Sequence, residues 1–150
     1  KIKDVRVAML TTAEQDGSLR SRPMYTQQAD FTGELWFFTA DNSGKVAEIS
    51  ADSDVNLAYV EPKDSRYVSV TGKAELVKDA AKMDELWSPA LKAWFKGGRE
   101  DPHLALLRVT VTEAEYWDDT RSGMSQLFGM AKAALGRETY ESAEHGVVKP

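Results

Sequence analysis

Hydrophobic and polar residues alternate along several short stretches of the chain, which is the pattern of half-buried β-strands. Turn-forming runs separate these stretches, among them Glu14-Gln15-Asp16-Gly17 and Pro62-Lys63-Asp64. The pattern predicts six strands, over residues 5–12, 19–28, 34–40, 54–60, 67–77 and 104–112, with an extension of the last to Trp117 left open. We expect the first three strands to form an antiparallel meander, and Gly72 to mark a bulge or a close backbone approach.

Helical periodicity is confined to a few segments. Apolar residues recur at three-to-four spacing over residues 80–95, where Ser88-Pro89 reads as an N-cap followed by the first helical residue, so two short helices are expected. Further helices are expected over residues 45–49 and 125–135, the latter ended by Gly136. Six short strands with sparse helices and no repeated βαβ unit favour a closed antiparallel barrel.

Composition narrows the class of protein. With 150 residues, 42% of them hydrophobic and 29% charged, the chain is large enough to bury one core, so we expect a single domain over residues 1–150. The net charge of −5 and the dispersed Lys and Arg residues argue against binding to nucleic acid. No apolar run approaches the roughly 20 residues of a membrane helix, so no membrane partner is expected.

The absence of cysteine also limits the chemistry. Without Cys the chain has neither a disulfide framework nor a thiolate metal site, and a reducing cytoplasm is the simplest location. Only His103 and His145 remain as imidazole ligands, and their separation argues against a metal site. The chain starts without Met, carries no signal-peptide pattern and reaches its first strand at Val5, so we expect a short N-terminal segment that is missing or not ordered.

The segment from Phe37 to Lys45 carries the clearest chemical signal. An apolar strand runs into Thr39, a short polar turn and a Ser-x-Lys sequence that opens a helix. The hydroxyls of Thr39 and Ser43, the N–H groups of the first helical turn and the Lys45 ammonium can converge on one phosphate. The plainer alternative is that Ser43 only caps the helix while Lys45 is solvated.

A second signal lies on the strand over residues 19–28, which reads Arg20-Ser21-Arg22-Pro23-Met24-Tyr25. Two cations stand beside an apolar methionine, and Pro23 lacks the N–H that a central strand would use, which places the strand at a rim or edge. In an isolated strand, Arg20 and Arg22 would more often form a solvated polar face.

In their order and spacing these segments resemble the pyridoxamine phosphate oxidase-like FMN-binding split barrels, and specifically their general stress protein branch. Arg22-Pro23-Met24 resembles the strand along which that family runs its backbone beside the flavin ring, and Thr39 with Ser43-x-Lys45 is similar to its phosphate-binding segment. Residues 68–75 and 115–117 resemble its fifth and final barrel strands, so the resemblance runs from Val5 to about Trp117. It implies a mainly β fold with short helices, a six-stranded antiparallel split β-barrel.

The resemblance also implies a cofactor and a partner. The cofactor is FMN, with FAD or a deazaflavin left open, and it lies at the interface of a homodimer. Thr39, Ser43 and Lys45 would neutralise the phosphate, while a flat apolar slot would hold the ring. The implied cofactor-binding residues are Arg22, Pro23, Met24, Phe38, Thr39, Ser43, Gly44, Lys45, Tyr67 and Trp117, with Arg20 undecided.

Several of these assignments have alternatives. Trp117 is implied to reach the flavin of the other subunit, but a Trp that closes the end of the barrel is equally open. Tyr67 stands where pyridoxamine phosphate oxidases carry an amide, and Gly44 where they often carry Arg, so the cofactor contacts are not expected to be identical. The other tryptophans fit packing positions in the core or on a helix face, namely Trp36, Trp87 and Trp94.

Catalysis is less well defined. Pyridoxamine phosphate oxidases grip their substrate with an Arg and His arrangement after the final strand, whereas residues 118–125 contain no His, so vitamin B6 oxidation is not expected. The catalytic residues stay unknown. Three function classes are open: a flavin-dependent oxidoreductase of unknown substrate, a non-catalytic flavin-sequestering or sensing protein, and a β-barrel interaction module without flavin.

Overall fold

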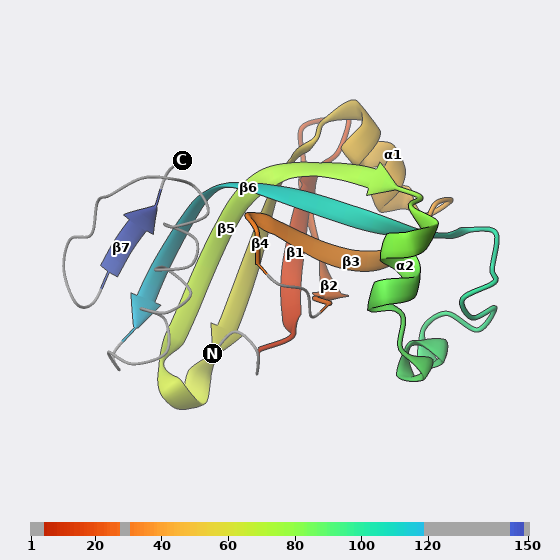
Figure 1. Cartoon of the computed structure of the whole chain (residues 1–150). Coiled ribbons are helices and arrows are strands. Elements are labelled where there is room, and N and C mark those ends of the chain that lie inside the picture. Colours follow the sequence, from red (N-terminus) through yellow and green to blue (C-terminus); the bar gives the residue numbers. More distant parts are fainter. Residues whose placement is uncertain (1–4, 28–30, 119–144, 149–150) are drawn as a thin grey trace.

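The computed structural model of the chain describes residues 5–27, 31–118 and 145–148 (Figure 1). The helix expected over residues 125–135 and the N-terminal segment before Val5 lie outside the described residues. No helix among those described is long and apolar enough to cross a membrane.

The described elements are strands with a few short helices between them. The strands are β1 (Val7–Ala13), β2 (Leu19–Tyr25), β3 (Glu34–Ala40), β4 (Asp54–Glu61), β5 (Arg66–Val77), β6 (Leu104–Asp118) and β7 (His145–Val148). The helices are α1 (Gly44–Ala51) and α2 (Ala80–Leu86), and the 3-10 turns are η1 (Pro62–Asp64) and η2 (Pro89–Ala93). The two short helical segments expected around Ser88-Pro89 are therefore present, the second as a 3-10 turn with Pro89 in its first turn.

All strand pairs are antiparallel, and the sheet runs in the order β2-β1-β4-β5-β6-β3 with β7 added beside β6. The sheet curls (Figure 1), and an isolated bridge between Thr26 and Phe37 links its two ends. The predicted antiparallel split barrel of six strands is confirmed in β1 to β6. Strand β7 was not predicted from the sequence.

The expected meander of the first three strands is wrong. Strand β3 pairs along its length with β6, from Glu34 opposite Thr110 to Ala40 opposite Leu104. It meets the end of β2 only at the Thr26–Phe37 bridge and through a hydrogen bond from Gln27 N to Trp36 O, 2.9 Å long. The apolar run of β3 is buried on both faces, so it pairs with the equally apolar start of β6.

Two apolar clusters lie on either side of β3. Phe37 and Leu107 belong to the barrel core, whereas Phe38 and Leu106 face the second cluster, which α2 and η2 complete with Met83, Leu86 and Leu91. The helical region is thereby fixed against the outside of β3 (Figure 1). Beside it, the β3–α1 connection and the edge strand β2 enclose the candidate site.

Gly72 lies where two strands approach closely, as predicted. The register between β5 and β6 shifts between Thr71 and Gly72, which is a bulge. A Cβ atom at Gly72 would lie 2.5 Å from the Thr110 backbone oxygen. Glycine is therefore needed at this point of the barrel.

Candidate functional site

The β3–α1 connection holds Lys45 in a defined position. Ser43 is the N-cap residue of α1, but its hydroxyl makes no capping hydrogen bond. Instead, Lys45 Nζ donates to Ser43 Oγ at 3.1 Å and to Thr39 Oγ1 at 3.0 Å. Thr39 is buried and Lys45 is half-buried. The alternative of a merely capping Ser43 with a solvated Lys45 is therefore wrong.

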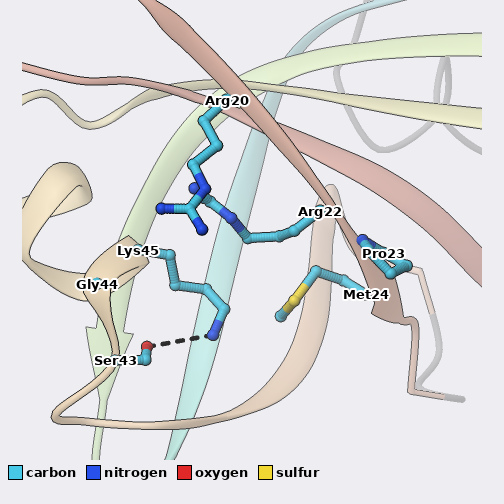
Figure 2. Close-up of a pocket in the computed structure, with 7 residues that line it drawn as sticks. All are labelled: Arg20, Arg22, Pro23, Met24, Ser43, Gly44 and Lys45. Atoms are coloured by element: carbon cyan, nitrogen blue, oxygen red, sulfur yellow. Dashed lines mark hydrogen bonds between the residues drawn. The ribbon is translucent and has the colours of Figure 1, made fainter.

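Strand β2 brings two arginines to the same place. A cavity of about 310 Å³ is lined by Arg20, Arg22, Pro23, Met24, Ser43, Gly44 and Lys45. Figure 2 shows the side chains of Arg20, Arg22 and Lys45 extending into the space between β2 and the start of α1. We call this space the basic cavity. As expected for a strand with Pro23, β2 lies at the end of the sheet order.

The two arginines differ in their surroundings. The Arg20 side chain is 64% exposed and lies 3.8 Å from Glu14. Arg22 is only 16% exposed: its guanidinium donates to Glu48 Oε2 at 2.8 Å and to Thr12 Oγ1 at 2.7 Å. Thr12 in turn donates to the same Glu48 oxygen at 2.5 Å. The solvated polar face considered for this strand is therefore wrong for Arg22, which is held rigidly between β1, β2 and α1.

The electrostatics of the basic cavity favour an anion. Burial, followed by the charge of Arg22, lowers the pKa of Lys45, and the Glu48 carboxylate offsets only part of this effect. A lowered pKa means that the ammonium is less well solvated here than in water. Arg22 is paired with Glu48, and Arg20 lies 3.8 Å from Glu14, so the Lys45 ammonium is the cation whose charge a bound anion would compensate.

A second cavity, of about 360 Å³, adjoins the first and shares Pro23, Met24 and Lys45 with it. We call it the apolar arm. Phe38 and Thr39 line it from β3, and Phe38 packs edge-on against Trp87, with ring centroids 5.5 Å apart. The other lining residues are mostly apolar or aromatic: Val7, Tyr25, Gln27, Ala40, Leu91, Trp94 and Phe95. A few polar anchoring groups beside a mostly apolar extension are typical of a small-molecule site.

Tyr67 and Trp117 line neither cavity. They are paired opposite each other on β5 and β6, and both are exposed, Tyr67 by 41% and Trp117 by 40%. The preceding residue, Tyr116, is buried in the barrel core, so Trp117 points outward. A Trp that closes the end of the barrel is therefore not what the structure has. Within one chain, eight of the ten predicted site residues gather at the two cavities, and these two lie elsewhere.

Comparison with known proteins identifies the family of this chain. The model of the family described as pyridoxamine 5'-phosphate oxidase like matches residues 1–141. The chain belongs to this family. General stress protein 26 of Bacillus subtilis is 33% identical over 116 residues, which make up 73% of this chain and 80% of that protein. The predicted membership of the general stress protein branch is thereby confirmed.

Solved structures of the family have the same fold. The general stress FMN/FAD binding protein from Xanthomonas citri is 32% identical, with a TM-score of 0.69 over 81% of this chain and 86% of that one. General Stress Protein 26 from Bacillus anthracis is 26% identical, with a TM-score of 0.68 over 77% and 86% of the two chains.

In this member of the pyridoxamine 5'-phosphate oxidase-like family, sequence reasoning missed Glu48 and Thr12. Glu48 follows Lys45 by three residues and so shares its helix face, a signal that could have been found. Thr12 is separated from Arg22 by a hairpin, and only the register of β1 and β2 brings them close. The expected packing role is also wrong for Trp94, which is 66% exposed, whereas Trp36 belongs to the apolar cluster beside α2 and Trp87 packs against it.

Glu48→Gln is expected to destabilise the protein by about 1–2 kcal/mol, because the variant removes a charge-assisted hydrogen bond to a largely buried guanidinium. The hydrogen bonds from Thr12 and Arg22, together with the charge of Arg22, lower the pKa of Glu48, and burial offsets only part of this effect. The ionised carboxylate therefore contributes stability above its unfolded pKa of about 4.3, and this stability is lost as the pH falls through the lower pKa of the folded state.

Thermal unfolding of Glu48→Gln at a series of pH values should show a weaker loss of stability with acid than in the wild type. Exposed Glu100→Gln is the control, and equal acid sensitivity of wild type and Glu48→Gln would contradict the role of Glu48.

Among the described residues, no group of three or more His, Cys, Asp or Glu side chains could hold a metal ion. His145 lies opposite Trp117 in the register of β7 and β6, a neighbourhood that the sequence spacing did not indicate.

Proposed function

We propose that this general stress protein family member binds a flavin, and that the flavin is FMN. The observation that carries the proposal is the convergence of Arg20, Arg22 and Lys45 on one cavity that opens into an apolar arm. The FMN/FAD binding of the Xanthomonas citri relative, at 32% identity, supports it. A cytoplasmic location is part of the proposal, since a cysteine-free chain suits a reducing compartment.

The residues present fit the chemistry of FMN. Lys45, with Ser43 and Thr39, would bind the phosphate dianion, and the backbone of Pro23 and Met24, common to both cavities, would lie along the ring. The Arg22 guanidinium is fixed by Glu48 and Thr12, so it needs no reordering when the phosphate arrives. Bound flavin would supply electron or hydride transfer, and the chain would supply orientation and electrostatics.

Identification of the released ligand tests this proposal directly. The purified protein is expected to be yellow and to release FMN on denaturation, as shown by absorbance and mass. FAD or a deazaflavin would correct the cofactor but keep the class. A colourless protein that also fails to bind added FMN would refute flavin binding and favour an interaction module.

A homodimer with the flavin at the subunit interface is the second part of the proposal. Exposed apolar side chains form a band across the outer face of four strands: Val60 lies opposite Tyr67, and Tyr67 opposite Trp117. Val7, 50% exposed, is adjacent to this row on β1 and also lines the apolar arm. A second copy related by a two-fold axis would cover the band and bring its own Trp117 near this arm.

The dimer prediction has a direct test. Wild-type protein is expected to scatter light as a dimer at micromolar concentration, and Val60→Glu is expected to weaken the dimer at least tenfold, about 1.4 kcal/mol, because it buries a carboxylate in the band. Leu19→Glu is the matched control, since Leu19 is 75% exposed outside the band. A wild-type monomer that still binds flavin would contradict the shared site.

We extend the proposal to a flavin-dependent oxidoreductase that acts on a small molecule and is not a pyridoxamine phosphate oxidase. The proposed flavin supports the first statement, because its ring would carry electron or hydride transfer to or from a small molecule. Oxidation of NADH or NADPH by the flavin-loaded protein under air is the test. No turnover above the rate of free flavin would favour a flavin-sequestering or sensing protein.

Pyridoxamine phosphate is expected to be a poor substrate even when the flavin site is full, because residues 118–125 lack the His of the vitamin B6 oxidases. The nearby His145 comes from a separate strand, so it does not reproduce that sequence arrangement. The measurement is pyridoxal phosphate formation under air, with free FMN as the control. A rate near the enzyme median of about 10 per second would overturn the prediction.

A further inference from the structure

Trp94 is a large aromatic side chain that the fold leaves uncovered. It is 66% exposed, whereas its neighbours along the same segment, Leu91 and Phe95, pack into or against the cluster beside α2. Its one ring contact among the described residues is Tyr25 on β2, at 5.9 Å between centroids and 27° between planes. Packing of the core therefore does not account for the position of this indole.

The position of Trp94 is nevertheless fixed. It ends the 3-10 turn η2, where its N–H donates to Leu91 O at 3.0 Å and the next N–H, of Phe95, donates to the same oxygen at 2.9 Å. Leu91 is buried and anchors the turn. The near-parallel contact with Tyr25 orients the indole further. A rigid and exposed aromatic face loses little conformational entropy when a ligand covers it.

Trp94 and Tyr25 line the apolar arm and not the basic cavity, while Lys45 lines both. A ligand with its phosphate at Lys45 and a flat ring in the arm would therefore meet the aromatic pair on the side remote from the phosphate. The arm, about 360 Å³ in volume, has the size of a small-molecule site, and its aromatic lining suits a planar and electron-poor ring.

We propose that the Trp94 indole, supported by Tyr25, contacts the ring system of the flavin. It would contribute to flavin affinity through the ring and not through the phosphate. The inference rests on the proposed binding of flavin. The turn η2 then becomes part of the cofactor site, although it is not among the segments whose sequence resembles flavin-binding segments of the family. The site is thereby separated into a phosphate end at Lys45 and a ring end at Trp94.

The test compares FMN with riboflavin, which has the same ring and no phosphate. Trp94→Ala is expected to weaken both ligands by the same factor, about tenfold, which corresponds to about 1.4 kcal/mol and is the scale of stacking between an aromatic side chain and a heterocycle. Trp94→Phe should recover much of the loss, because it restores an aromatic face. The quenching of flavin fluorescence in the complex should decrease in Trp94→Ala.

Controls separate this inference from the proposed function. Lys92→Ala changes an exposed residue of the same turn that lines neither cavity, and it should bind both flavins as wild type does. Wild-type protein that binds neither flavin would refute the proposed function itself. If wild-type protein binds FMN and the Trp94→Ala variant binds FMN and riboflavin as tightly as the wild type does, only the role of Trp94 would be overturned.

Discussion

Replacing Lys45 by Ala is expected to lower the affinity for FMN by about tenfold or more and to leave the affinity for riboflavin nearly unchanged. The ammonium is held by Thr39 and Ser43 at the edge of the basic cavity, where a charge-assisted contact with the proposed phosphate would be worth roughly 1.5–3 kcal/mol. Its partly buried position strengthens this contact, because fewer water molecules screen it.

The measurement is a pair of titrations of apo protein, one with FMN and one with riboflavin. Lys96→Ala, which removes an exposed lysine that lines neither cavity, is the matched control and should change neither affinity. Equal losses for the two ligands in Lys45→Ala would place Lys45 away from the phosphate. Unchanged binding of both would remove it from the site.

Gly72→Ala is expected to destabilise the fold by about 3 kcal/mol, the upper end of the usual cost of overpacking. The new methyl group would lie 2.5 Å from the Thr110 backbone oxygen and 2.7 Å from Val109 Cγ1. The oxygen belongs to β6, which is paired with β3 on its other edge, so it cannot move without disturbing both ladders. Relief of the clash would therefore disturb the centre of the barrel.

Urea unfolding gives the comparison, with Gly44→Ala as the matched control. A Cβ atom at Gly44 would meet nothing within 4 Å, and this glycine is the first residue of helix α1, where alanine is tolerated or stabilising. A midpoint for Gly72→Ala equal to that of the wild type would show that the bulge accommodates a side chain. A large loss in both variants would show that the effect is not specific to the close approach.

The sequence determined the local elements of this protein. Alternation, and for β3 a continuous apolar run, located strands β1 to β6 within a few residues, and the turn residues located where the strands end. The proposed phosphate-binding segment was also visible in the sequence. Thr39, Ser43 and Lys45 lie within one strand–turn–helix unit, so their proximity follows from short-range geometry.

The tertiary structure decided which distant segments meet. The pairing of β3 with β6 replaced the expected meander, because burial of β3 on both faces depends on α2 and on the barrel core together. The bonds from Arg22 to Thr12 and Glu48, and the exposure of Trp94 beside Tyr25, likewise join residues whose separation along the chain carries no signal of contact. Periodicity specifies the face of an element, whereas the partner of that face is set by the packing of the whole chain.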